Sequence, residues 1–163
     1  MTQELDDVEM ELPSRQRHLR YYLLGIIDGE GCFSLALKRQ ASAKFGWVLD
    51  PVFHVAQHKK NRFVLDILQR ELRCGRVRPK YGQPDTMILI VDNRRQIGEI
   101  LLPYLRKYKP LVKRNEFEIF AGAVEALERG DHHDYRKFRK LVADAFTMNY
   151  EGKQRRHDLR EVL

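Results

Sequence analysis

The chain has 163 residues, enough to bury one hydrophobic core without disulfide or metal crosslinks, and it leaves little room for a second independent domain. Basic side chains outnumber acidic side chains by 30 to 23, although the first thirteen residues hold five acids and no base. Residues 14–163 therefore carry a net charge of +12. This excess favours a polyanionic partner, nucleic acid before an anionic membrane, and a solvated basic surface is the plain alternative.

Cysteine usage and hydropathy indicate the compartment. Cys32 and Cys74 lie far apart in segments predicted to be structured, which fits free thiols in a reducing compartment better than a disulfide. The longest apolar run, residues 21–27, is far too short to span a bilayer, and the acidic N-terminus has the wrong charge for a targeting peptide. We therefore expect an intracellular protein with no membrane partner.

The first half of the chain predicts one helix, two strands and a second helix. Residues 1–13 form an acidic N-terminal arm, and Ser14 is a plausible N-cap for a helix that runs to about Asp28, within a single domain of residues 14–163. From residue 32 the apolar period changes to two, which predicts a strand, and residues 47–57 predict another with Pro51 at an edge or a bulge. A helix over about 60–72 follows from the spacing of Phe63, Val64, Ile67 and Leu68, with Gly75 as its stop.

The second half predicts a hairpin and then helices. Two short strands, "GRVRPK" and "TMILIV", are joined by the turn-rich "YGQPD". Helices are expected over 94–104, 113–129 and 135–148, with a basic connector over 106–115 and a tail that is a short helix or loose. This order predicts an α+β domain with one mostly antiparallel four-stranded sheet, helices on one face and the other face open.

The segment "YYLLGIIDGEGCF", residues 21–33, carries an unusual combination of glycines and acids. Gly25 and Gly29 are four residues apart, hence on one side of the first helix, and each costs about 1 kcal/mol relative to alanine. Glycines at this spacing allow two backbones to approach closely, which suggests packing on another helix, including the same helix of a second copy. Alternatively, Gly29 and Gly31 only terminate the helix in the left-handed conformation.

Asp28 and Glu30 stand at the C-terminal end of this predicted helix. There the helix dipole is negative and disfavours each acid by roughly 0.3–1 kcal/mol. Acids placed against the dipole suggest a bound cation, and carboxylate and carbonyl oxygens are ligands suited to Mg²⁺. Position and charge alone leave a solvated turn as the more common explanation.

The nine residues "LLGIIDGEG", Leu23 to Gly31, closely resemble the LAGLIDADG motif of homing endonucleases, and the predicted order of elements is that of the family core. The resemblance covers about residues 19–147 and is closest to the single-motif, homodimeric branch found in group I introns. It implies a fold of helix, strand pair, helix, strand pair and final helices, whose saddle-shaped sheet lies in the major groove of double-stranded DNA. It also implies an enzyme that cuts both strands at a long target site and promotes mobility of an intron, in a prokaryotic cytoplasm or an organelle.

The single motif copy implies a homodimer, because cutting both strands needs a reactive carboxylate near each scissile phosphate. By resemblance the two motif helices pack together at the dimer axis through Leu24, Gly25, Asp28 and Gly29. Leu24 replaces a small residue of the motif, so close packing has to rely on the glycines. Asp28 aligns with an acid that is more often structural.

The resemblance also implies the catalytic residues. Glu30 aligns with the metal-binding acid, and the Gly29 carbonyl completes the coordination of Mg²⁺ or Mn²⁺, which activates a water and stabilises the leaving oxygen. Gln57 matches a glutamine of the family site, and Lys113 is our choice for a lysine, with Lys109 as the fallback. Where close relatives place an arginine this chain has Asn61 beside Arg62, which leaves open which of the two fills the basic role.

Alternation along the strands predicts which side chains face DNA. Basic and amide side chains there can form hydrogen bonds with guanine or adenine in the major groove. Lysine and arginine side chains outside the sheet are expected to contact phosphates instead. The predicted DNA-facing positions are Ser34, Ala36, Lys38, Gln40, His54, Arg76, Arg78 and Lys80. The predicted phosphate contacts are Lys59, Lys60 and Arg62.

Two alternatives remain at the level of sequence. The cluster "DHHD", residues 131–134, lacks a firm metal-ligand spacing, so a solvated loop and helix start is the better reading. The whole chain is predicted to be a Mg²⁺-dependent endonuclease, and the alternative is a non-cleaving member of the same fold that acts as an RNA splicing maturase, with intron RNA as its partner, or as a DNA-binding regulator.

Overall fold

The structure is a computed structural model that describes residues 14–148 and residue 162. The predicted acidic arm and most of the predicted tail lie outside the described residues. The first half of the described chain contains α2 (Ser14–Glu30), β1 (Gly31–Arg39), β2 (Trp47–His58), a 3₁₀ turn (Lys59–Asn61) and α3 (Arg62–Leu72). The second half contains β3 (Arg76–Lys80), β4 (Gln83–Val91), α4 (Arg94–Gln96), a π-helical stretch (Ile97–Leu101), α5 (Leu102–Lys107), α6 (Arg114–Glu128), a 3₁₀ turn (Asp131–His133) and α7 (Tyr135–Thr147).

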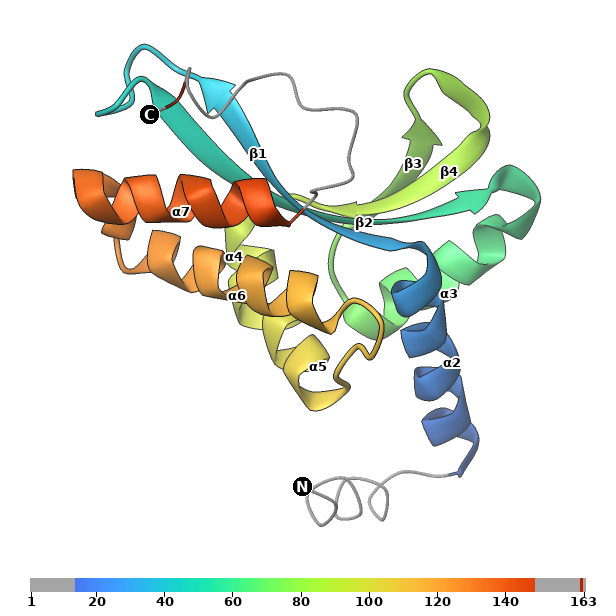
Figure 1. Cartoon of the computed structure of the whole chain (residues 1–163). Helices are drawn as coiled ribbons and strands as arrows, with labels where there is room; N and C mark the ends of the chain where they lie inside the picture. The colour runs from blue at the N-terminus through green and yellow to red at the C-terminus, as the bar shows by residue number, and fades with distance from the viewer. Residues whose placement is uncertain (1–13, 149–161, 163) are drawn as a thin grey trace.

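The four strands form one antiparallel sheet in the order β1-β2-β4-β3, as predicted. Figure 1 shows the helices gathered on one side of this sheet, while the sheet curves away from them at both ends. The opposite face is concave, and none of the described helices covers it. This arrangement confirms the predicted α+β class.

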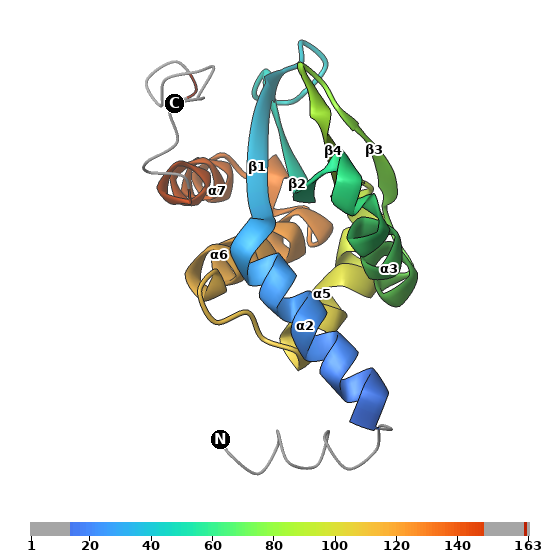
Figure 2. The same ribbon diagram turned by 90° about the vertical axis from the view of Figure 1, so that its right-hand side faces the viewer.

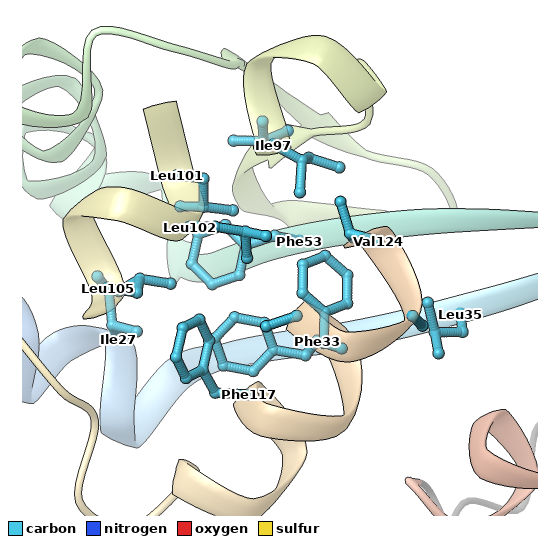
Figure 3. Close-up of a cluster of buried hydrophobic side chains, with 14 of the residues drawn as sticks. Ile27, Phe33, Leu35, Phe53, Ile97, Leu101, Leu102, Leu105, Phe117 and Val124 are labelled. Carbon is cyan, nitrogen blue, oxygen red and sulfur yellow. The ribbon is translucent and has the colours of Figure 1, made fainter. Parts of the chain in front are cut away.

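The core lies between the sheet and the helices. Phe33 of β1 packs against Phe53 of β2 and against Phe117 and Phe120 of α6, with ring centroids 5.1, 5.7 and 5.3 Å apart respectively. Ile27 of α2 points into the same cluster (Figure 3) and is fully buried. Burial of large apolar side chains at about 25 cal/mol per Å² is the main stabilising contribution here, and it fixes α2 against the sheet.

The junction between α2 and β1 differs from the sequence prediction. The helix continues to Glu30 and β1 begins at the next residue, so the two elements are joined end to end (Figure 2). Neither Gly29 nor Gly31 has a positive φ, so the interpretation of these glycines as left-handed terminators is wrong. A Cβ added at Gly31 would instead collide with the main-chain oxygen of Ile27, so Gly31 is required for space.

We therefore predict that Gly31→Ala lowers the free energy of unfolding by about 1–3 kcal/mol, the usual cost of overpacking. Gly122→Ala in α6 is the matched control, because no atom lies within 4 Å of its added Cβ and alanine favours a helix by about 1 kcal/mol. Urea unfolding of both variants measures the difference. Equal stability of the two variants would show that the α2–β1 junction has room for a side chain.

Helix α3 ends at Leu72, as predicted, but the residue that stops it is Arg73, which adopts the left-handed conformation with φ 57°, and not Gly75 two residues later. Phe63, which was expected on its apolar face, is 61% exposed. Strand β4 includes the predicted turn residues 83–85, since Gln83 pairs with Lys80, which leaves a two-residue turn.

Pro51 lies where β2 pairs with β1 alone, because the pairing with β4 begins at Phe53. The predicted edge position is therefore confirmed for this part of the strand, although β2 is central further along. Both cysteines are free, as predicted, and burial raises the pKa of Cys74 to about 11. Within the described residues, no helix combines the length and the apolar character needed to cross a membrane.

Candidate functional site

The C-terminal end of α2 presents Glu30 to solvent at the start of the sheet. The last turn of α2 holds no basic residue, and no described residue forms an ion pair or hydrogen bond with the Glu30 carboxylate. Gly29 is also exposed. A carboxylate and carbonyl oxygens at the negative end of a helix are acceptors without donors, a chemical environment that suits a divalent cation.

Asp28 has a different environment from Glu30. Its carboxylate accepts hydrogen bonds from the main-chain N–H of Leu111 (2.8 Å) and of Lys113 (3.2 Å), both in the basic connector. Lys113 is the N-cap of α6, so Asp28 also lies at the positive end of that helix dipole. The acid that looked misplaced at the end of α2 is therefore stabilised by the start of α6, and its role within the chain is structural.

The contact of Asp28 with the connector has a consequence for Lys113. It holds the main chain of Lys113 beside the end of the motif helix. Lys113 and Lys80 both lie close enough to Cys32 to oppose the rise in the pKa of its thiol that burial causes. Asp28 and Cys32 flank Glu30 in the sequence, so Lys113 lies at the end of α2 that carries the exposed acid. Lys109, the fallback, is exposed four residues earlier in the connector.

Gln57 reaches the same end of the sheet from β2. Gly31 pairs with Val55, so Gln57 lies two residues beyond the start of the β1–β2 pairing, at the end of the sheet where α2 meets β1. Its side chain is half-buried. Glu30, Gln57 and Lys113 thus come from three elements to one end of the sheet.

The two candidates for the basic role start α3. Asn61 is exposed and occupies the N-cap of α3 without a side-chain capping bond. Arg62 is also exposed and lies 3.5 Å from Asp66 in an i,i+4 ion pair. Neither residue contacts Gln57 or Glu30 through a described hydrogen bond, so the choice between them stays open.

We predict that Asp28→Ala lowers the free energy of unfolding by about 1–3 kcal/mol, because two main-chain donors lose their acceptor. Asp28→Asn should cost less, since its amide oxygen can still accept one of the bonds. Asp66→Ala, which removes an exposed i,i+4 partner, should change stability by less than about 0.5 kcal/mol. Urea unfolding compares the three variants, and an effect of Asp28→Ala no larger than that of Asp66→Ala would contradict the structural role.

The concave face carries most of the predicted DNA-facing side chains. Cys32, Ser34, Ala36 and Lys38 of β1 pair in register with His54, Val52, Asp50 and Val48 of β2, so these residues share one face. Ile90 of β4 pairs with both His54 and Arg76, and Ile88 pairs with Arg78, which places the β3 arginines on the same face. Lys80 is close enough to His54 to lower its pKa, together with the larger effect of burial.

Gln40, which was predicted to face DNA from the first strand, lies one residue beyond the end of that strand. Strand β1 ends at Arg39, and Gln40 opens a turn in which its N–H donates to the carbonyl of Gly46 and its carbonyl accepts from Ala43. Its side-chain amide donates to the Ser42 hydroxyl at 2.9 Å. Gln40 therefore lies just outside β1, and its DNA-facing role stays a prediction.

Two acids on the concave face were missed by the sequence reasoning. The Asp92 carboxylate accepts hydrogen bonds from both terminal nitrogens of Arg76, each at 2.7 Å. The arginine lowers the pKa of the Asp92 carboxyl. Asp50 forms an ion pair with Lys38 at 2.6 Å. Asp50 has the strand parity of the concave face, which was the available signal, whereas Asp92 follows directly after β4 and is placed by its bonds to Arg76.

The cluster at residues 131–134 is a loop and helix start, as expected. Asp131 binds Arg129 and Lys137, while the Asp134 side chain caps α7 by accepting from the N–H of Lys137. No group of three or more His, Cys, Asp or Glu side chains that could hold a metal gathers in the part of the chain that the structure describes. A cation at Glu30 would therefore take its other ligands from main-chain carbonyls, water, DNA or a second copy.

Comparison with known proteins identifies the family. A model described as LAGLIDADG endonuclease matches residues 23–123. The homing endonuclease I-ApeII of Aeropyrum pernix is 32% identical over 152 residues, which cover 89% of this chain and 88% of that protein. The DNA endonuclease I-CeuI of Chlamydomonas moewusii is 32% identical over 105 residues, which cover 64% of this chain but 46% of that protein.

Solved structures agree with this assignment. The archaeal intron-encoded homing endonuclease I-Vdi141I, complexed with DNA, superposes with a TM-score of 0.83 at 34% identity, over 90% of this chain and 93% of that one. The homing endonuclease I-TnaI superposes with a TM-score of 0.75 at 26% identity, over 88% and 92% of the respective chains. The family match covers more than half of the sequence, and the chain accordingly belongs to the LAGLIDADG endonuclease family.

Proposed function

We propose that this protein is a site-specific homing endonuclease that cuts both strands of a long DNA target and promotes mobility of the intron that encodes it. The observation that carries the proposal is the position of Glu30, an exposed acid without a described partner at the end of the motif helix, where the concave sheet face begins. Relatives named as homing endonucleases, one of them solved with DNA, support this reading. They do not favour the maturase, and intron RNA stays an untested partner.

The reaction we propose is hydrolysis assisted by Mg²⁺ or Mn²⁺. Glu30 and the Gly29 carbonyl would hold the metal, which when bound supplies an activated water and stabilises the charge on the leaving 3′ oxygen. Gln57, half-buried at the end of the sheet where α2 meets β1, orients water through its amide. Lys113, whose main chain is held by Asp28, places a positive charge toward the attacked phosphate.

We propose that the active form is a homodimer. Gly25 and Gly29 are exposed on α2, and an added Cβ at either would meet no atom of the described chain. On the other side of the helix Leu23 and Ile27 are fully buried in the core. A second copy of α2 could thus approach the glycine side closely, with Leu24 and Asp28 at its margins, and would bring a second Glu30 to the other strand.

The concave face would lie in the major groove. Ser34, Lys38, His54, Arg78 and Lys80 have the placement to contact base edges. Arg76 would keep Asp92 as its partner in the free protein, so its use in binding requires that the pair reorients. Arg62, with Lys59 and Lys60 in the turn before it, would contact phosphates beside the sheet.

Cleavage of a randomised plasmid library in Mg²⁺, followed by sequencing of the cut ends, tests the proposed function. We expect a single long target with double-strand cuts, and no cutting in EDTA. The library also supplies the target for every later measurement. Tight binding to intron RNA without cutting of any DNA would overturn the proposal in favour of the maturase.

A further inference from the structure

The first half of α7 carries a basic surface that the proposed reaction does not use. Its side chains Arg136, Lys137, Arg139 and Lys140 are all exposed, within five consecutive positions. Phe138, Leu141, Val142 and Ala145 are buried against the body, which fixes the rotation of the helix. Because of the helical period, Arg136 and Lys140 lie opposite this buried side and Arg139 lies beside them.

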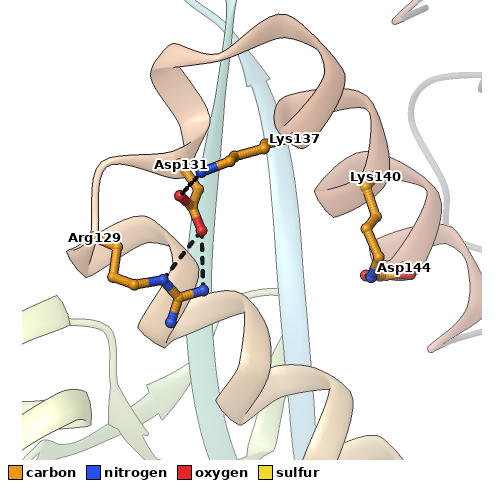
Figure 4. Close-up of polar contacts among 5 residues, drawn as sticks. All are labelled: Arg129, Asp131, Lys137, Lys140 and Asp144. Atoms are coloured by element: carbon orange, nitrogen blue, oxygen red, sulfur yellow. Dashed lines mark hydrogen bonds and ion pairs between the residues drawn. The ribbon is translucent and has the colours of Figure 1, made fainter.

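The described acidic residues neutralise only part of this charge. Figure 4 shows Lys137 bound to Asp131 together with Arg129, and Lys140 bound to Asp144; the Lys137–Asp131 and Lys140–Asp144 distances are 2.8 and 2.9 Å. Arg136 and Arg139 form no ion pair with any described residue. Arg139 lies over the ring of Tyr135, 5.8 Å from its centroid, which leaves its charge available. Arg136 and Arg139 thus expose two positive charges that have no acidic partner among the described residues.

The position of α7 relates this charge to the concave face. Lys44, in the turn between β1 and β2, donates to the main-chain carbonyl of His133 at 2.9 Å, directly before α7. Phe45 in the same turn packs against Tyr135 and Phe138, with ring centroids 5.3 and 5.4 Å away. Figure 1 accordingly shows α7 beneath β1 and β2, at the end of the sheet away from α2.

The length of β1 gives the distance between the proposed cleavage site at Glu30 and the start of α7. Its nine residues run from Gly31, next to Glu30, to the turn beside α7. At about 3.3 Å per residue the strand spans about 30 Å, the length of about nine base pairs of B-DNA. DNA lying along the concave face would therefore pass the start of α7 only beyond the base pairs that the sheet contacts.

We propose that Arg136 and Arg139 bind the phosphate backbone of the duplex that flanks the target, outside the base pairs read by the sheet. This inference rests on the proposed function, because it assumes that DNA lies along the concave face. The two arginines sit on a helix outside the sheet, so their contact adds affinity without adding sequence specificity. The partner is duplex DNA, since its phosphates continue past the end of the sheet in either direction.

The test measures the salt dependence of DNA affinity on two duplexes. One contains only the target, and the other extends it by ten base pairs on each side. Each phosphate contact contributes about 0.9 to the slope of log K against log salt concentration, so Arg136→Gln/Arg139→Gln should reduce the slope of a dimer by about 3 to 4 on the long duplex. The same variant should match the wild type on the short duplex.

Two further variants separate a contact from a general charge effect. Arg136→Lys/Arg139→Lys keeps the charge and should restore most of the slope. Arg95→Gln/Lys107→Gln removes two exposed charges from α4 and α5 and should leave the slope on both duplexes unchanged. An unchanged slope for the α7 double variant on the long duplex, or an equal loss on the short one, would overturn the proposal.

The same experiment distinguishes this failure from failure of the proposed function. If the wild type cuts the short duplex but the α7 variant shows no difference on the long one, only the α7 contact is wrong. If the wild type neither binds nor cuts the target on either duplex, both proposals fail.

Discussion

Replacing Glu30 by Gln is expected to lower the rate of double-strand cleavage by about a thousandfold or more, since loss of a metal ligand removes at least ~4 kcal/mol of transition-state stabilisation. DNA affinity and dimerisation should stay near wild type, because the side chain is exposed and of equal size. Stability should rise slightly, by about 0.3–1 kcal/mol, since the variant relieves an acid at the negative end of α2.

The control for this variant is Glu118→Gln, which removes an exposed acid from the middle of α6 and should leave cleavage unchanged. Cleavage is followed on a plasmid that carries the target, and affinity is followed by titration of a labelled duplex in Ca²⁺ or EDTA. Wild-type cleavage by Glu30→Gln at the confirmed site would remove Glu30 from the mechanism.

The double variant Gly25→Leu/Gly29→Leu should separate folding from dimerisation. No atom of the described chain lies within 4 Å of a Cβ added at either position, and each leucine replaces a residue that costs a helix about 1 kcal/mol. The protomer should therefore fold with equal or greater stability. In the proposed dimer the same side chains would overpack the two-fold interface at four places, which should weaken dimerisation by at least ~3 kcal/mol, more than a hundredfold in Kd.

Sedimentation equilibrium measures the dimer directly, and urea unfolding reports the stability of the protomer. Gly122→Leu serves as control, because it is also an exposed helical glycine without a neighbour but lies on α6. It should leave the monomer–dimer equilibrium unchanged. A double variant of α2 that dimerises with wild-type affinity would place the interface elsewhere on the molecule.

The order of the elements and the sheet could be predicted because hydrophobic periodicity carries that information locally. The alternation of Phe33, Leu35 and Leu37 identified the core face of β1, and the opposite parity identified the concave face before any register was known. The alternation rule applies only while the strand lasts, so it does not place Gln40, whose N–H donates to the carbonyl of Gly46 in the turn that follows β1.

The site was less predictable because its contacts join distant parts of the chain. The bonds from Leu111 and Lys113 to Asp28 bridge more than eighty residues, so no local pattern reveals them. Even so, they account for the acid that looked unfavourable at the end of α2. The pair of Arg76 and Asp92 was likewise missed because strand pairing alone does not say which acid lies next to which base.

Gly31 illustrates the remaining limit of sequence reasoning. A glycine after a helix most often supplies a left-handed cap, which is the alternative that the sequence offers for Gly31. The structure needs the glycine for a different reason, since the strand leaves the helix so abruptly that a side chain would meet the Ile27 carbonyl. Local conformation at such a junction depends on the direction of the next element, which the neighbouring residues do not encode.

The most direct test of the central claim uses dimers that contain one wild-type chain and one Glu30→Gln chain, isolated through two different affinity tags. If each Glu30 serves one DNA strand, these mixed dimers should convert a supercoiled plasmid carrying the target into nicked circles, at close to the wild-type rate for one strand. Homodimers of the wild type should yield linear DNA on the same plasmid. Linear product from the mixed dimers at the wild-type rate would contradict the assignment of one catalytic Glu30 to each strand.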